Sequence, residues 1–191
     1  MKKILLLVLA VVSVLITGCS LFQDEKPQPP KQISFIIYRA AADGSEKLLP
    51  EKFTMTDNGK SLPENALLAL VGAKPQSTKY EDVIPHGTRV LSFSITPEGT
   101  ALANFSKEIV KNGQGSYNEV MMTGAIVNTL TEFPEVKQVQ ILVEGKKVIT
   151  LGGHLDVEDP LKRNESLLQK NIIKKELLRN KKRDVFDISF F

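Results

Sequence analysis

The sequence predicts an α+β fold, in which a mixed or antiparallel β-sheet carries two helices on one face. Three observations support this class. Apolar and polar residues alternate in several short segments, which is typical of strands. Two longer segments repeat their apolar residues at helical spacing. Between an N-terminal leader and a basic tail, the composition is that of one globular domain with a sizeable core.

The N-terminal leader has the layout of a signal peptide, because Lys2 and Lys3 precede an apolar run that ends at Ile16. This run is shorter than the roughly 20 apolar residues that a membrane-spanning helix needs. Residues 15–19, Leu-Ile-Thr-Gly-Cys, resemble the bacterial lipobox, and Cys19 is the only cysteine. We therefore expect residues 1–18 to be removed, and a diacylglyceryl lipid on Cys19 to anchor the chain to the extracytoplasmic face of the cell membrane.

A linker and a basic tail flank the predicted domain. Residues 19–32 are rich in proline and charge, which favours an extended, solvated linker. The tail, residues 162–191, has nine Lys and Arg against four Asp and Glu, a charge of +5. Outside the membrane it could contact anionic wall polymers or lipid headgroups, and nucleic acid is not an expected partner. A solubilising tail is the alternative. Its apolar pairs recur every five residues, a spacing that gives a helix no single apolar stripe, so it stays open whether the tail is helical.

The domain, residues 33–161, is predicted to begin with two strands and a short helix. Residues 33–39 and 48–55 have the composition of strands, and an Ala-Asp-Gly-Ser turn lies between them. Ser61 and Glu64 have the spacing of a capping box, so a helix should begin there. Gly72 is expected to end this helix in the left-handed conformation.

The second half of the domain is predicted to contain two hairpins and a longer helix. Residues 89–105 read as a hairpin around a Thr-Pro-Glu-Gly turn. Ser116 and Glu119 have the spacing of a second capping box, at the start of a helix that Pro134 ends. Residues 136–151 form the other hairpin. The order of elements indicates a pseudo-repeat of a helix followed by a hairpin.

Few residues suit catalysis or metal binding. His154 and Asp156 are two residues apart, which places both side chains on one face of an extended segment. A zinc site usually needs at least three protein ligands, so we favour a strand-end turn in which Asp156 accepts backbone hydrogen bonds. His86 is expected in a turn that leads into a strand. The sequence therefore predicts no catalytic residue, no metal and no cofactor.

Two other segments resemble chemical motifs only in part. Ser106 precedes Lys107, but adjacent helical residues point about 100° apart, so Ser106 is better interpreted as the N-cap of a short helix. Residues 112–116 contain glycines but lack the lysine and the preceding buried strand of a phosphate-binding loop. Neither segment indicates an enzyme.

Three stretches resemble the GerMN domain of sporulation and spore-germination lipoproteins of the GerM type. They are residues 83–91, residues 126–136, and residues 143–156, the last of which ends in Gly-His-Leu-Asp. The resemblance covers residues 33–161, and its most specific part is a Thr-Leu-Thr-Glu-Phe-Pro segment. After the first predicted helix the family commonly has a Gly-Pro pair, where residues 71–75 of this chain read Val-Gly-Ala-Lys-Pro.

The resemblance implies an α+β domain related to the ring-building modules of spore-envelope assemblies. It implies a non-enzymatic part in sporulation or germination, with a protein partner or self-association, and it supplies no catalytic residues. Two alternatives stay open. One is an anchored module that binds wall polymer or a small ligand through His154, Asp156 and the basic tail; the other is a peptidoglycan hydrolase that uses the same two residues.

Overall fold

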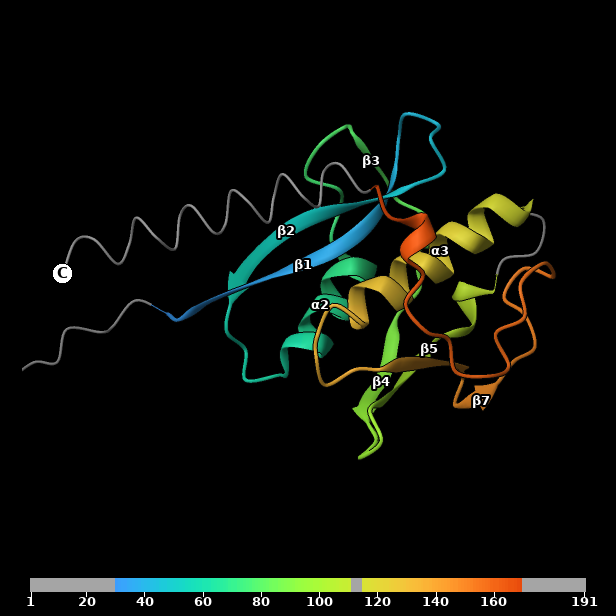
Figure 1. Cartoon of the computed structure of the whole chain (residues 1–191). Coiled ribbons are helices and arrows are strands. Elements are labelled where there is room, and N and C mark those ends of the chain that lie inside the picture. Colours follow the sequence, from blue (N-terminus) through green and yellow to red (C-terminus); the bar gives the residue numbers. More distant parts are fainter. Residues whose placement is uncertain (1–29, 111–114, 170–191) are drawn as a thin grey trace, which may run out of the picture. The chain divides into compact units, whose positions relative to one another are not determined.

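The computed structural model describes residues 30–110 and 115–169 (Figure 1). The chain divides into two compact units, Met1–Lys31 and Gln32–Phe191, and every described helix and strand belongs to the second. The predicted signal peptide, Cys19 and most of the linker lie outside the described residues, as does the tail from residue 170 onward. Within the described ranges, no helix is both long enough and apolar enough to cross a membrane.

The first sheet has three strands in the order β2-β1-β3. β1 (Gln32–Ala41) and β2 (Leu48–Thr56) form the antiparallel pair that the sequence predicts. Their shared face is partly aromatic, with the rings of Phe35 and Phe53 stacked 5.9 Å apart. β3 (Tyr80–Glu81) pairs with the end of β1 and was not predicted, because two residues give no readable alternation.

The second sheet has four strands in the order β4-β5-β6-β7. β4 (Val90–Ile95) and β5 (Thr100–Phe105) form the predicted hairpin, whose turn holds Gly99 at a φ of 90°. β6 (Gln138–Val143) runs parallel to β5, and β7 (Lys146–Lys147) runs antiparallel to β6. This sheet is therefore mixed.

The two predicted helices are α2 (Leu62–Gly72) and α3 (Gly115–Leu130), and they lie between the two sheets (Figure 1). α2 contacts β1 and β4, whereas α3 contacts β1, β2 and β6. The α+β class with two helices is confirmed, but the prediction of one sheet with both helices on one face is wrong. One reason lies at β1, where the N–H of Tyr38 donates to Thr129 Oγ1 of α3 at 2.9 Å. The helix thus binds an edge group of β1 that a further strand would need.

The ends of the helices differ from prediction in two places. Ser61 caps α2 as expected, since its Oγ accepts a hydrogen bond from the N–H of Glu64 at 3.3 Å. A left-handed stop at Gly72 is wrong, because the chain leaves the helix in an extended conformation at Ala73, whose φ is −92°. α3 ends at Leu130, before Pro134, in a tightened turn where the N–H of Phe133 donates to the Leu130 carbonyl.

The second predicted hairpin is shorter than expected. β7 is only two residues long, and the chain continues as a loop through residue 151, where the sequence predicted a strand. The N–H of Leu151 donates to the carboxylate of Glu119 at 2.9 Å, so it is not available to a neighbouring strand. The pseudo-repeat of helix and hairpin stays a prediction.

The described residues also form two short 3-10 helices, η2 (Lys107–Ile109) and η3 (Glu165–Leu167). η2 forms where a short helix was predicted, and Ser106 is its N-cap residue in an extended conformation, as expected. Its Oγ makes no cap hydrogen bond to η2 and instead accepts one from the N–H of Arg89 at 3.0 Å. Ser106 therefore joins the two ends of the β4-β5 hairpin.

Candidate binding site under a C-terminal strap

Residues 161–169 form a strap that crosses α3 and joins the two sheets. At one end, Leu161 and Val139 of β6 exchange two backbone hydrogen bonds of 2.8 Å. At the other end, Leu168 bridges to Leu48 of β2, and the N–H of Gln169 donates to the Leu48 carbonyl. The strap includes residues 162–169, which the sequence assigns to the tail. The first part of the predicted tail therefore packs on the domain. In Figure 1 it is the orange-to-red segment beside α3.

Backbone and side-chain hydrogen bonds fasten the middle of the strap to α3. Asn128 is fully buried, and its side chain pairs with the backbone of Asn164. Its amide accepts from the N–H of Asn164 at 3.0 Å and donates to the carbonyl at 3.3 Å. The side chain of Asn164 in turn caps η3 by accepting from the N–H of Ser166.

Arg163 attaches the strap at a second place, to β1 and to the turn that follows α3. Its guanidinium lies over the ring of Tyr38, 5.4 Å from the centroid, and donates to the Tyr38 hydroxyl at 3.1 Å. It also pairs with Glu132 at 2.9 Å. Burial, reinforced by the charge of Glu132 and opposed by Arg163, raises the pKa of Tyr38 from 10.0 to about 12. The Tyr38 hydroxyl therefore stays protonated and donates to Glu132 at 2.9 Å.

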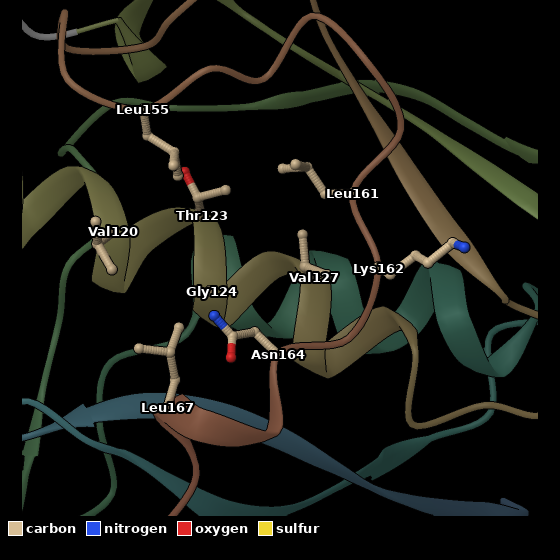
Figure 2. Close-up of a pocket in the computed structure, with 9 residues that line it drawn as sticks. All are labelled: Val120, Thr123, Gly124, Val127, Leu155, Leu161, Lys162, Asn164 and Leu167. Carbon is tan, nitrogen blue, oxygen red and sulfur yellow. The ribbon is translucent and has the colours of Figure 1, made fainter.

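A cavity of about 140 Å³ lies between the strap and α3 (Figure 2). Aliphatic side chains form most of its wall, and Lys162 is the only titratable residue among the described residues that line it. The lining residues are Val120, Thr123, Gly124, Val127, Leu155, Leu161, Lys162, Asn164 and Leu167. A concave, mostly apolar wall with a few polar groups is typical of a binding site.

Gly124 lets the strap approach the helix closely. A Cβ atom at this position would lie 2.5 Å from Cδ1 of Leu167 and 3.2 Å from Cδ1 of Leu48. Both distances are shorter than ordinary van der Waals contact, so a larger residue would push the strap outward. The absence of a side chain at Gly124 therefore sets the depth of this part of the cavity floor.

Among the described residues, Thr123 is the buried polar residue of the cavity wall whose side chain lacks a hydrogen-bond partner. The residue is 2% exposed, and Oγ1 has no hydrogen-bond partner within the described part of the chain. Figure 2 shows the hydroxyl directed toward the side chain of Leu155. Most buried hydroxyls in proteins are hydrogen-bonded, so this one is an exception. A bound ligand could supply the hydrogen bond that it lacks.

Glu119 of α3 holds the loop that bears Leu155. Its carboxylate is 2% exposed and accepts backbone hydrogen bonds of 2.8 to 2.9 Å from this loop. Burial alone would raise the pKa of this carboxyl, but the backbone donors outweigh it and the pKa lies below the ordinary 4.5. Those donors are Gly152, His154, Leu151 and Leu155. The predicted capping box of Ser116 and Glu119 is thus wrong, because the carboxylate faces a distant loop.

His154 and Asp156, the candidates from the sequence, lie on the same loop but outside the cavity wall. Both side chains are exposed. Asp156 Oδ1 accepts a hydrogen bond from the N–H of Glu158 at 2.9 Å, which is a local turn contact. His86 is exposed in the turn before β4. Among the described residues, no three His, Cys, Asp or Glu side chains lie close enough together to hold a metal ion.

Comparison with known proteins gives one family and one fold. The family model for Germane, described as sporulation and spore germination, matches residues 36–149. The spore germination protein GerM of Bacillus subtilis (strain 168) is 25% identical to this chain over an alignment of 201 residues. The alignment covers 81% of this chain and 53% of that protein. The chain thus spans about half the length of this curated relative.

Two solved structures from Bacillus subtilis share the fold. The tandem GerMN domains of the sporulation protein GerM match with a TM-score of 0.60 and 21% identity, covering 69% of this chain and 46% of that one. The first GerMN domain of the same protein matches with a TM-score of 0.58 and 23% identity, covering 69% of this chain and 98% of that one. The GerMN resemblance seen in the sequence is confirmed, and this chain belongs to the Germane family of sporulation and spore germination.

Proposed function

We propose that the chain is a lipid-anchored protein of the cell envelope, whose GerMN-like domain acts in sporulation or spore germination by binding a protein partner. Membership of the Germane family supports a part in sporulation or spore germination, and the Bacillus subtilis relative is named for spore germination. The observation that carries the binding role is the cavity under the strap. Its wall is mostly aliphatic, as in sites that recognise apolar groups.

The same cavity supports a non-catalytic role. Catalysis of acyl or glycosyl transfer uses a nucleophile, an acid or base, or a metal within reach of one another. Lys162 is the only titratable residue that lines the cavity, and the hydroxyl of Thr123 has no base beside it among the described residues. The domain therefore suits recognition better than bond breaking.

The anchor rests on the sequence. The lipobox-like residues 15–19 place the only cysteine where a lipid would be attached, and two acyl chains anchor a protein stably. Mass spectrometry of the mature protein tests this. We expect an N-terminal peptide that begins with diacylglyceryl-modified Cys19, and release of the Cys19→Ser variant from the membrane fraction. A free thiol in a membrane-bound protein would contradict the anchor.

The partner-binding role is tested by complementation in the organism that carries the gene. The full chain should restore heat-resistant spores or germination to a deletion strain. Val120→Phe, which fills the cavity wall, should fail to restore them. Ile149→Phe is the matched control, because the same ring is added at a side chain that is 65% exposed and does not line the cavity. With equal protein levels, equal rescue by both variants would contradict a binding role for the cavity.

A further inference from the structure

We infer that the cavity under the strap receives a single tyrosine side chain of the protein partner. This inference rests on the proposed function and names the chemical group that the site recognises. It draws on three observations: the size of the cavity, the unpaired hydroxyl of Thr123, and the position of Leu155 over that hydroxyl.

The size of the cavity limits the occupant to one ring or one short aliphatic group. Its volume is about 140 Å³. An apolar protein cavity of roughly 150 Å³ accommodates benzene, so an aromatic ring fits here and a long acyl chain does not. The wall contacts expected for such a ring are with Val120, Val127 and Leu161, all of which line the cavity.

The hydroxyl of Thr123 selects an occupant with a polar atom. Thr123 Oγ1 is buried and has no hydrogen-bond partner among the described residues, and a group left unpaired in this way destabilises the folded state. A phenylalanine ring would leave it unpaired. A tyrosine ring fills the same space, and its hydroxyl can donate or accept, so it satisfies Thr123 Oγ1. Tyrosine is also enriched at the energetic centres of protein interfaces.

Leu155 is the side chain that must move for the ring to reach Thr123. In Figure 2 the hydroxyl of Thr123 is directed toward Leu155, and the oxygen is covered in the structure. Leu155 is partly exposed on a loop with no strand pairing of its own, and the backbone hydrogen bonds to Glu119 hold that loop. Shortening Leu155 should therefore open the path to the hydroxyl without disturbing α3.

The test compares two side-chain analogues, p-cresol for tyrosine and toluene for phenylalanine. The protein is the full chain with Cys19→Ser, so that neither probe dissolves in attached lipid. Dissociation constants are measured by NMR titration. We expect p-cresol to bind at least tenfold more tightly than toluene, and Leu155→Ala to increase the affinity for p-cresol several-fold. Thr123→Val should reduce the affinity for p-cresol to that for toluene. Thr123→Ser keeps the hydroxyl, so it should preserve the preference for p-cresol.

Equal affinities for the two probes in the unmutated cavity and in Leu155→Ala would overturn the inference, as would a preference that survives Thr123→Val. Failure of the tyrosine inference can be distinguished from failure of the proposed partner-binding function. If Val120→Phe abolishes complementation but p-cresol shows no preference, the cavity binds a partner through another group. If p-cresol binds as expected but Val120→Phe complements fully, the site recognises tyrosine but the partner-binding function fails.

Discussion

Leu167 of the strap packs so closely against Gly124 of α3 that a Cβ atom at residue 124 would lie 2.5 Å from Leu167 Cδ1. Glycine in the middle of a helix is less favourable than alanine by about 1 kcal/mol. The contact with Leu167 gives a physical reason for glycine at this position. Helix, strap and first sheet meet here, because Leu48 of β2 would lie 3.2 Å from the same Cβ.

Gly124→Ala should loosen the strap without unfolding the domain. The alanine gains about 1 kcal/mol of helix propensity, which offsets part of the loss of packing as Leu167 moves aside. We expect overall stability to change by about 1 kcal/mol or less, while the amide protons of Leu168 and Gln169 exchange faster. In a Leu167→Ala background the same substitution should become stabilising. A Gly124→Ala protein with unchanged exchange in the strap would show that Leu167 is not seated on the helix.

Arg163→Ala should destabilise the domain by about 1–2 kcal/mol, because the charge is partly exposed and its partners remain partly buried. The change leaves the hydroxyl of Tyr38 and the carboxylate of Glu132 with fewer partners. Arg163→Lys keeps the charge but lacks the planar fork, so it should recover only part of the loss. Chemical denaturation measures both variants. Full recovery by lysine would mean that charge alone fastens the strap.

Glu119 should make the domain sensitive to acid. The folded-state pKa of this carboxyl lies below 4.5, so the unfolded chain takes up the proton first as pH falls. The stabilisation is therefore fully present above about pH 4.5 and is lost as the pH falls through the lower folded-state pKa. Glu119→Gln should reduce stability at pH 7 by about 2 kcal/mol, because an amide accepts fewer of the loop hydrogen bonds.

The control for Glu119 is the difference in unfolding free energy between the unmutated protein and Glu119→Gln, measured as a function of pH. The gap in unfolding free energy between unmutated protein and Glu119→Gln should narrow as the pH is lowered from 5 toward 2. A gap that stays constant over this range would mean that Glu119 is not the titrating group. Hydrogen exchange at Gly152 and His154 should rise in the variant, because these N–H groups donate to the carboxylate.

Tyr38 should give a separate loss of stability in alkali. Its pKa is about 12 in the folded protein, against 10.0 in the unfolded chain. The unfolded chain therefore loses the proton first, so the stabilisation is present below pH 10 and is lost as pH rises toward 12. Tyr38→Phe should remove this part of the pH dependence. An alkaline titration of tyrosine absorbance in which all tyrosines ionise near pH 10 would contradict the prediction.

Elements with strong local patterns could be predicted from the sequence. The strands β1, β2, β4 and β5 have alternating or aromatic-rich sequences with clear turns between them, and α2 has a serine cap. Alternation, turn residues and helix caps depend only on residues that are close in the sequence. By contrast, β3 and β7 are two residues long, so their existence depends on a neighbouring strand and leaves no pattern.

The arrangement of the sheets could not be predicted, because it depends on contacts between distant residues. Thr129 binds the N–H of Tyr38 across 91 positions, and Glu119 binds that of Gly152 across 33. A carboxylate three residues after a serine has the same spacing whether it caps its own helix or holds a remote loop. Only the folded structure distinguishes the two.

The candidate site was missed for the same reason. Its residues come from α3, the loop at Leu155 and the strap. The strap falls within the predicted tail, because apolar pairs that recur every five residues form no single helical stripe. One signal was present in the sequence. Gly124 interrupts an apolar helical pattern, and a glycine there indicates close packing of another segment. His154 and Asp156 attracted attention by residue type, but the structure places their side chains in solvent.

If the domain recognises a protein through the cavity under the strap, site-specific photocrosslinking in living cells should capture that protein at the cavity. A photoreactive residue replaces Leu161, which lines the cavity, or Ser94, which is exposed on β4 and serves as the control. During sporulation or germination, we predict a discrete adduct from residue 161 that is absent from residue 94 and disappears when Val120→Phe is added. The same adducts from both positions, or an adduct that survives Val120→Phe, would contradict the claim.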